Sequence, residues 1–357
     1  MGRDWTSDQA PRAGALALWE ADTHWQGVHR PPCLWRAHPA RASRQAHASS
    51  RDARAATCFQ RNPKERQPGG RTVKKVVVTG AKGNTGVSIV KILRQSGYHV
   101  VGIDVKPADF WEQDYHVADL EDGASLHDIC SGAFAIVHFG SFPTDSQTSW
   151  EKAYRNLALG GFHVLQAAAN LGIRRVVMAS SPEIYGLPGS LKYLPIDEDH
   201  PQRPRSIYGA VKQTLEALAQ NYARWHGMTV ASLRTLRIVY EGSYEWRFRR
   251  FTVSDEAAAP DLWAYVDARD VATACKAALE AEIEGHEAFV IAASDVCVET
   301  PTRQLLQRFY PAMEEIRAEL AGQAGLYSTA KAERLLKWKP QHHWKSMAAE
   351  SEQNKRS

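Results

Sequence analysis

A short run of valines ends in three glycines within residues 75–86, Lys-Val-Val-Val-Thr-Gly-Ala-Lys-Gly-Asn-Thr-Gly. Three consecutive β-branched residues suit a strand buried on both faces, and residues 87–93 carry apolar side chains at helical spacing. The pattern predicts a strand, a tight loop and a helix. In such a unit Gly80 makes the turn, Gly83 lets the backbone approach a pyrophosphate, and Gly86 lets the helix pack closely on the strand. A phosphate would then lie at the N-terminus of the helix.

From residue 73 onward apolar strands alternate with amphipathic helices, which favours a parallel sheet wound by right-handed crossovers. We therefore expect an α/β fold, a doubly wound Rossmann-type parallel sheet with a small C-terminal substrate-binding region. The expected strands after the first lie at 98–105, 116–120, 135–139, 174–179 and 288–293, and the expected helices include 125–129, 151–171, 270–279 and 301–309. The expected organisation is a basic disordered tail (1–72), an NAD(P)-binding domain with the catalytic residues (73–240), a substrate-binding region with closing elements (241–345) and a frayed tail (346–357).

Residues 1–72 differ in composition from the rest of the chain. They hold no Ile or Tyr, one Val, one Phe and four Trp, and 12 Lys and Arg against 6 Asp and Glu, a local charge of +6. Because the whole chain carries +4, residues 73–357 carry −2, which argues against a nucleic-acid-binding body. Disorder, or translation from upstream of the authentic start, is the preferred interpretation. A transit peptide and a nucleic-acid-binding tail are the alternatives.

The five cysteines are scattered and lack CxxC spacing, so the sequence indicates neither a disulfide framework nor a zinc site. The sequence shows no apolar run of membrane-spanning length and no secretory signal. We expect a cytoplasmic protein with no bound metal and no membrane partner.

Asp104 ends the second expected strand, about two dozen residues after the first glycine. A carboxylate at this place can accept hydrogen bonds from an adenosine ribose, which favours NAD over NADP. Lys82 and Lys106 lie nearby and could accept a 2′-phosphate, so NADP is the alternative cofactor. A plain turn residue is the structural alternative for Asp104.

The strand at 135–139 runs into Gly140, at the sheet edge where a cofactor crevice is expected. His138 lies within this apolar strand, and we interpret it as a packed core residue rather than a base. The pattern of the helix 151–171 does not decide whether Asn156 faces inward or outward.

Tyr208 and Lys212 are four residues apart in Ser206-Ile-Tyr-Gly-Ala-Val-Lys212, so on a helix they share a face. An ammonium beside a phenol favours the phenolate and lowers the tyrosine pKa, as an acid or base in catalysis requires. Ser181, after the strand 174–179, can orient a substrate oxygen. A pair at this spacing is also common by chance, but its place after a Gly-rich turn favours catalysis.

Together these motifs resemble the NAD-dependent epimerase/dehydratase family of extended short-chain dehydrogenases/reductases. The resemblance covers roughly 73–345 and is carried by 79–86, 118–120, 138–140, Asn156, 180–186, 208–212, Leu233-Arg234 and 265–272. It implies that Tyr208 is the catalytic acid/base, that Lys212 holds the nicotinamide ribose and that Ser181 assists. Asp104 would bind the adenosine ribose and Asp119 the adenine edge. The cofactor-binding residues that it implies are Gly80, Gly83, Asn84, Thr85, Gly86, Asp104, Asp119, Leu120, Phe139, Gly140, Ser141, Asn156, Tyr208, Lys212 and Leu236.

Three departures from the family bear on the substrate. Nucleotide-sugar dehydratases carry adjacent Asp and Glu where this chain has Pro182-Glu183, and nucleotide-sugar epimerases usually carry Asn at the position of Arg237. Only 24 residues separate Tyr240 from Tyr265, where such enzymes insert most of their substrate domain. This compact layout is similar to uronate dehydrogenases of the family, in which a loop arginine holds a carboxylate.

Arg247 is the best match for that arginine, with Arg237, Arg249 and Arg250 as rivals. A guanidinium binds a carboxylate through two parallel hydrogen bonds. The alternative is that these arginines line a solvated loop. The expected substrate-binding residues are Ser181, Glu183, Arg237 and Arg247.

The sequence thus predicts hydride transfer between NAD and a small sugar-like substrate, with a sugar acid as one option. A nucleotide-sugar 4-epimerase or decarboxylase is the first alternative, and a non-catalytic NAD(P)-binding sensor is the second. The expected partners are a small molecule and, as family members often form, a second copy in a homodimer.

Overall fold

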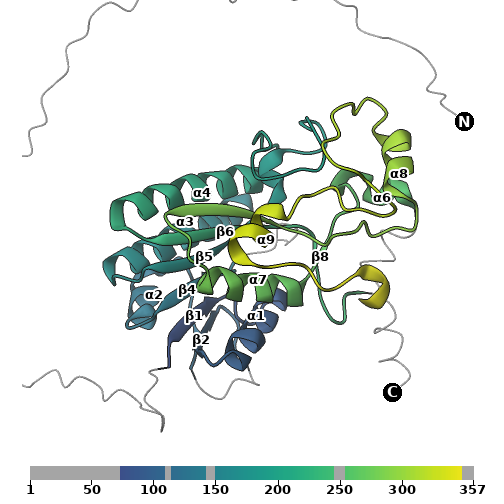
Figure 1. The fold of residues 1–357 in the computed structure, drawn as a ribbon. Coiled ribbons are helices and arrows are strands. Elements are labelled where there is room, and N and C mark those ends of the chain that lie inside the picture. Colours follow the sequence, from purple (N-terminus) through teal and green to yellow (C-terminus); the bar gives the residue numbers. More distant parts are fainter. Residues whose placement is uncertain (1–72, 109–113, 142–148, 245–253, 348–357) are drawn as a thin grey trace, which may run out of the picture. The chain divides into compact units, whose positions relative to one another are not determined.

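The computed structural model describes residues 73–108, 114–141, 149–244 and 254–347 (Figure 1). Its main feature is a seven-stranded sheet in the order β3-β2-β1-β4-β5-β6-β9, with every neighbouring pair parallel. The strands are β1 Lys75–Thr79, β2 His99–Asp104, β3 Tyr115–Val117, β4 Ala135–His138, β5 Arg175–Ser180, β6 Thr229–Thr235 and β9 His286–Ile291. The strand order reverses between β1 and β4, the place where open parallel sheets bind their ligands. The predicted fold class is confirmed.

Helices cover both faces of the sheet, as Figure 1 shows. On one face α1 packs against α7, and on the other α3 contacts both α2 and α4. The bounds are α1 Asn84–Gln95, α2 Gly123–Cys130, α3 Trp150–Asn170, α4 Ile207–His226 and α7 Ala268–Glu280. Val76 and Val78 lie in one hydrophobic core while Val77 lies in the other, so alternate residues of β1 serve opposite faces.

The chain after residue 240 contributes short elements at one end of the sheet and then returns to it. These elements are α6 Asp255–Ala258, the 3-10 turn η2 Ala259–Asp261, α8 Thr302–Phe309 and α9 Ala330–Leu336. A second, two-stranded sheet pairs β7 Ile238–Val239 with β8 Val266–Asp267. Two elements after residue 240, α7 and β9, belong to the main fold, and the predicted division at residue 240 stays a prediction.

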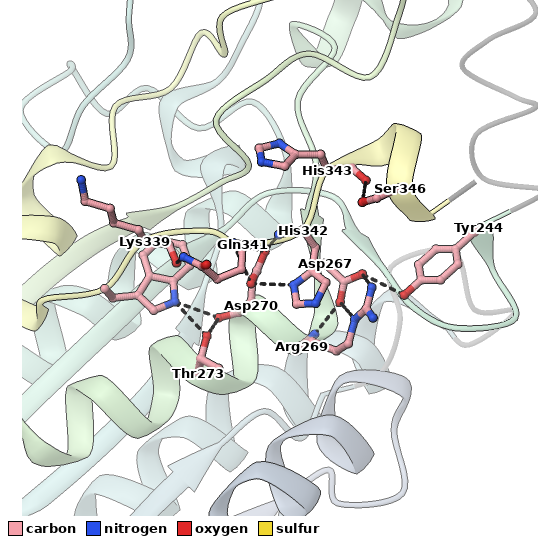
Figure 2. Close-up of polar contacts among 11 residues, drawn as sticks. Tyr244, Asp267, Arg269, Asp270, Thr273, Lys339, Gln341, His342, His343 and Ser346 are labelled. Atoms are coloured by element: carbon pink, nitrogen blue, oxygen red, sulfur yellow. Dashed lines mark hydrogen bonds and ion pairs between the residues drawn. The ribbon is translucent and has the colours of Figure 1, made fainter. Parts of the chain in front are cut away.

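Two buried aspartates at the start of α7 form hydrogen bonds to the chain after β7 and to the C-terminal segment (Figure 2). Asp270 accepts hydrogen bonds from the backbone amides of Gln341 and His342 and contacts the His342 ring at 2.9 Å. Asp267 accepts a hydrogen bond from the Tyr244 hydroxyl at 2.8 Å. The motif 265–272 therefore has a structural role, since it anchors the C-terminal segment and the chain that follows β7.

The glycine turn after β1 has the expected geometry. Gly80 has φ +70°, and a Cβ there would lie 2.7 Å from the Gly140 nitrogen on the neighbouring strand end. A Cβ at Gly86 would lie 1.9 Å from the Gly80 carbonyl oxygen. The close packing of α1 on β1 thus has no room for a side chain at position 86.

None of the helices in the described ranges is long and apolar enough to span a bilayer.

Replacing Gly86 with alanine should lower the free energy of unfolding by about 3 kcal/mol or more, because the new methyl group overlaps backbone rather than a movable side chain. Urea denaturation measures the change. Gly97→Ala is the control: Gly97 has φ +85° but no atom within 4 Å of the added Cβ. It should cost only about 1–2 kcal/mol of left-handed strain. Equal losses in the two variants would contradict the packing argument.

Candidate active site

One cavity of about 890 Å³ opens at the carboxyl ends of the central strands. Its volume is large for a ligand site. The sequence-predicted site residues that line it are Gly80, Gly83, Asn84, Thr85, Gly86, Asp104, Leu120, Phe139, Gly140, Ser141, Asn156, Ser181, Glu183, Tyr208, Lys212, Leu236 and Arg237. The fold therefore brings residues from eight separate chain segments into one place.

Among the predicted site residues that the structure describes, Asp119 does not line the cavity. Asp119 is exposed and accepts a hydrogen bond from the Glu121 amide at 3.0 Å, although its neighbours Ala118 and Leu120 line the cavity. Its contact with an adenine edge stays a prediction. Arg247 lies outside the described residues, as do its rivals Arg249 and Arg250.

The glycine turn makes one end of the cavity suited to a dinucleotide. Gly83 is the N-cap of α1 and supplies no side-chain cap, and the first helical residues, 84–86, line the cavity. Backbone N–H groups at a helix N-terminus bind phosphate groups. Residues of this kind fit the pyrophosphate of NAD.

Asp104 stands at the end of β2, beside this turn. Its carboxylate accepts hydrogen bonds from the backbone amides of Lys82 at 3.0 Å and Lys106 at 3.2 Å. These bonds fix the carboxylate at the cavity wall, which is the position a ribose-binding carboxylate needs. Both lysines also line the cavity, so the chemistry that would favour NADP is present too.

Tyr208 and Lys212 lie one turn apart on α4 and face the same cavity. Lys212 is buried, its Nζ donates a hydrogen bond to the Ala179 carbonyl at 2.7 Å, and it lies 5.5 Å from the centre of the Tyr208 ring. Ser181 is the N-cap of a 3-10 turn, η1 Pro182–Tyr185, and its hydroxyl accepts the Glu183 amide hydrogen. The three residues predicted to act in catalysis are therefore gathered at one end of β5.

The electrostatics of the tyrosine differ from the expectation. Burial raises the pKa of Tyr208, the negative charge of Glu183 raises it further, and a hydrogen bond with Ser181 opposes both. The expected lowering of the tyrosine pKa by Lys212 is thus not found, because burial penalises the phenolate more strongly. Burial also lowers the pKa of Lys212 to about 8, against the raising effect of Glu216.

A buried ion pair that the sequence did not reveal supports this arrangement. Arg234 on β6 donates to both carboxylate oxygens of Glu216 on α4, at 2.7 and 3.0 Å. The Ser180 hydroxyl donates to the same carboxylate at 2.5 Å. Since Ser180 lies between Ala179 and Ser181, the pair holds the stretch of β5 that contacts Lys212 and Tyr208. The sequence indicates Leu233-Arg234 only as part of the family pattern, because nothing in the linear sequence couples it to position 216.

The other end of the cavity is built from residues after β6 and from Glu183 and Leu187, which follow β5. Arg237 forms an ion pair with Asp261, and Glu183 accepts a hydrogen bond from Ser206, the N-cap of α4. Further lining residues here are Leu187, Ile238, Tyr240, Pro260, Asp261, Ala264 and Tyr327. The sequence gives no signal that Asp261 or Tyr327 belongs to the site.

His138 lies next to the cavity but does not line it. It is 2% exposed and its Nδ1 is 2.8 Å from the Thr79 hydroxyl, which also accepts the Gly140 amide hydrogen. Burial, reinforced by the charge of Lys212, lowers the pKa of His138 to about 3. The geometry agrees with its interpretation as a packed core residue.

Comparisons with known proteins found similar sequences and similar structures. The model of the NAD dependent epimerase/dehydratase family matches residues 76–254. The chain is 30% identical over 164 residues to a uronate dehydrogenase of Pseudomonas syringae pv. tomato, covering 45% of this chain and 58% of that protein. It is 25% identical over 307 residues to a UDP-glucose 4-epimerase of Corynebacterium glutamicum, covering 75% and 91%. It is 30% identical over 173 residues to an L-arabinose 1-dehydrogenase (NAD(P)(+)) of Haloferax volcanii, covering 45% and 65%.

The matched part thus spans less than two thirds of the dehydrogenases. Among solved structures, a short-chain dehydrogenase/reductase superfamily protein from Agrobacterium tumefaciens with bound NAD has a TM-score of 0.62 at 23% identity, covering 79% of this chain and 97% of that one. At this identity the likeness supports the fold.

Because His138 is buried, we expect the free energy of unfolding to decrease as the pH is lowered. The unfolded chain gains a proton below about pH 6.5, whereas the folded chain resists it down to about pH 3. Its contribution to the free energy of unfolding therefore falls through this window, by up to about 1.4 kcal/mol per pH unit. In His138→Asn the slope between pH 6 and pH 4 should be smaller, as urea denaturation at each pH would show. The exposed His116→Asn is the control, and an unchanged slope in His138→Asn would refute the assignment.

Proposed function

The chain belongs to the NAD dependent epimerase/dehydratase family, and on that premise we propose that it is an NAD-dependent oxidoreductase. It would move a hydride between NAD and a hydroxyl or hemiacetal carbon of a small sugar-like substrate. One observation carries the proposal: Tyr208, Lys212 and Ser181 meet in a cavity whose far end is a glycine turn at a helix N-terminus.

Each residue has a defined part in the oxidation. Ser181 orients the substrate hydroxyl, and Tyr208 takes the hydroxyl proton as the carbon–oxygen double bond forms. When bound, NAD supplies the acceptor for the hydride that leaves the same carbon. Lys212, whose Nζ lies 5.5 Å from the centre of the Tyr208 ring, would hold the nicotinamide ribose. Asp104 binds the adenosine ribose, which favours NAD, and NADP is the alternative.

The part of the cavity wall that follows β6 supports a small substrate, because it is formed by a few residues and short segments. That wall consists of Arg237, Tyr240 and short pieces around Asp261 and Tyr327. Two of the relatives named above are a uronate dehydrogenase and an L-arabinose 1-dehydrogenase, whose names denote free sugars. The assignment of Arg247 to a substrate carboxylate stays a prediction.

A nucleotide-sugar 4-epimerase is the second candidate. The match to the UDP-glucose 4-epimerase is the longest of the three sequence matches given above and covers 91% of that protein. An epimerase would use the same Tyr208 for a transient oxidation and release no net NADH. A non-catalytic sensor is disfavoured, because Tyr208 and Lys212 are both present and both face the cavity.

A homodimer through α3 and α4 is also part of the proposal. Among the described residues, Tyr154 and Phe162 on α3 and Ile207 and Trp225 on α4 are large exposed apolar side chains. Burying such side chains against a second copy would stabilise an assembly. Light scattering should find a dimer that Trp225→Asp weakens, whereas Val117→Asp, at an exposed site on β3, should not. A monomeric wild-type protein would contradict this part.

Tyr208→Phe should lower kcat by at least about 100-fold, because the variant cannot accept the substrate proton. NAD affinity should stay within about twofold, since the ring remains in place. The measurement is NADH formation by the full chain with free sugar acids, aldoses and nucleotide sugars, together with NAD binding by calorimetry. Tyr222→Phe is the matched control: Tyr222 is on the same helix but its hydroxyl bonds to Gln166 away from the cavity.

Retained turnover in Tyr208→Phe would contradict the catalytic assignment. Isomerised nucleotide sugar without net NADH would favour the epimerase.

A further inference from the structure

An ion pair forms part of the cavity wall at the substrate end. Arg237 follows β6 and Asp261 is the last residue of η2, and the two side chains are paired there. Their side chains are 32% and 46% exposed, and both line the cavity. A ligand entering this end therefore meets a carboxylate and a guanidinium together.

The backbone after Asp261 is strained in a way that fixes this residue. Leu262 and Trp263 have φ values of +53° and +54°, which non-glycine residues seldom adopt, and both side chains are fully buried. The Trp263 indole donates to the Asp255 carbonyl at 2.6 Å, and the Asp261 carbonyl accepts the Ala264 amide hydrogen at 3.1 Å. Strained residues persist where the surroundings enforce them, and they concentrate at functional sites. With this backbone conformation, Leu262 and Trp263 are buried in the core while Asp261 lies at the cavity wall.

The charges of the described residues at this end disfavour an acidic ligand. The charged residues lining this end in the described part of the chain are Arg237, Asp261 and Glu183, so one cation faces two carboxylates. Lys212 is bonded to Ala179 beside Tyr208. A substrate carboxylate bound by Arg237 would lie close to Asp261, which is paired with the same guanidinium. Like charges at such a distance repel.

A hydroxyl group suits the pair better than a carboxylate does. A hydroxyl donates one hydrogen bond and accepts others, whereas a carboxylate only accepts and a guanidinium only donates. Neighbouring hydroxyls of a sugar can donate to Asp261 and accept from Arg237 without separating the two. The pair thus matches the chemistry of an uncharged sugar.

We propose that Asp261 is a specificity-determining residue that holds Arg237 and selects an uncharged, hydroxyl-bearing sugar over the corresponding sugar acid. The inference rests on the proposed function, because it takes the substrate to be sugar-like. It narrows that function to neutral sugars.

The test compares two sugars that differ in one carboxylate, galactose with galacturonate and glucose with glucuronate. The wild-type full chain should show a kcat/KM for NAD reduction at least about tenfold higher with the aldose of each pair. Asp261→Asn keeps the size of the side chain and removes its charge, and it should reduce that preference by about tenfold. Glu256→Gln is the matched control, since Glu256 is an exposed acid nearby that does not line the cavity. It should leave the preference unchanged.

A second measurement, calorimetric binding of the same four sugars to the NADH-loaded protein, does not depend on turnover. It therefore shows whether the role of Asp261 or the proposed function is wrong. A wild-type preference for the acid, or an unchanged preference in Asp261→Asn, would overturn the role of Asp261 while leaving the oxidoreductase intact. If no sugar is oxidised, the proposed function fails, and the binding preference alone then decides the role of Asp261. Binding of no sugar at all would overturn both.

Discussion

The buried ion pair between Glu216 and Arg234 is the interaction on which the catalytic end of the cavity depends. It joins α4 to β6, and through the Ser180 hydroxyl it joins both to the end of β5. Burying two charges has a large desolvation cost, so such a pair adds little net stability. Removing one partner, however, leaves an uncompensated charge and costs about 3–5 kcal/mol. The pair therefore acts mainly as a geometric constraint on the residues around Lys212.

This constraint explains why Tyr208, Lys212 and Ser181 can be arranged together although they belong to different elements. The carbonyl that binds Lys212 and the hydroxyl that contacts Tyr208 belong to residues 179 and 181, on either side of Ser180. One hydrogen bond at Ser180 thus fixes both contacts. Such support is what a site needs to hold its reacting groups within a fraction of an ångström.

A second constraint, backbone contact without side chains, shapes the cofactor end. Gly80 approaches Gly140 across the sheet, and Gly86 approaches Gly80 along the turn. These contacts bring α1 against the strand ends and direct its N-terminus into the cavity. The two ends of the cavity are therefore built by different means, close backbone packing at one and a buried polar network at the other.

The sequence alone determined the alternation of strands and helices, the glycine turn and the shared helix face of Tyr208 and Lys212, because each depends on residues a few positions apart. Only the tertiary structure decided what depends on distant segments. It brought Asn156 into the cavity, paired Glu216 with Arg234, and raised the pKa of Tyr208 through burial. It also placed Asp261 against Arg237, which no local pattern indicates. Local spacing fixes which side chains share an element, whereas the packing of elements fixes which charges meet and how far water is excluded from them.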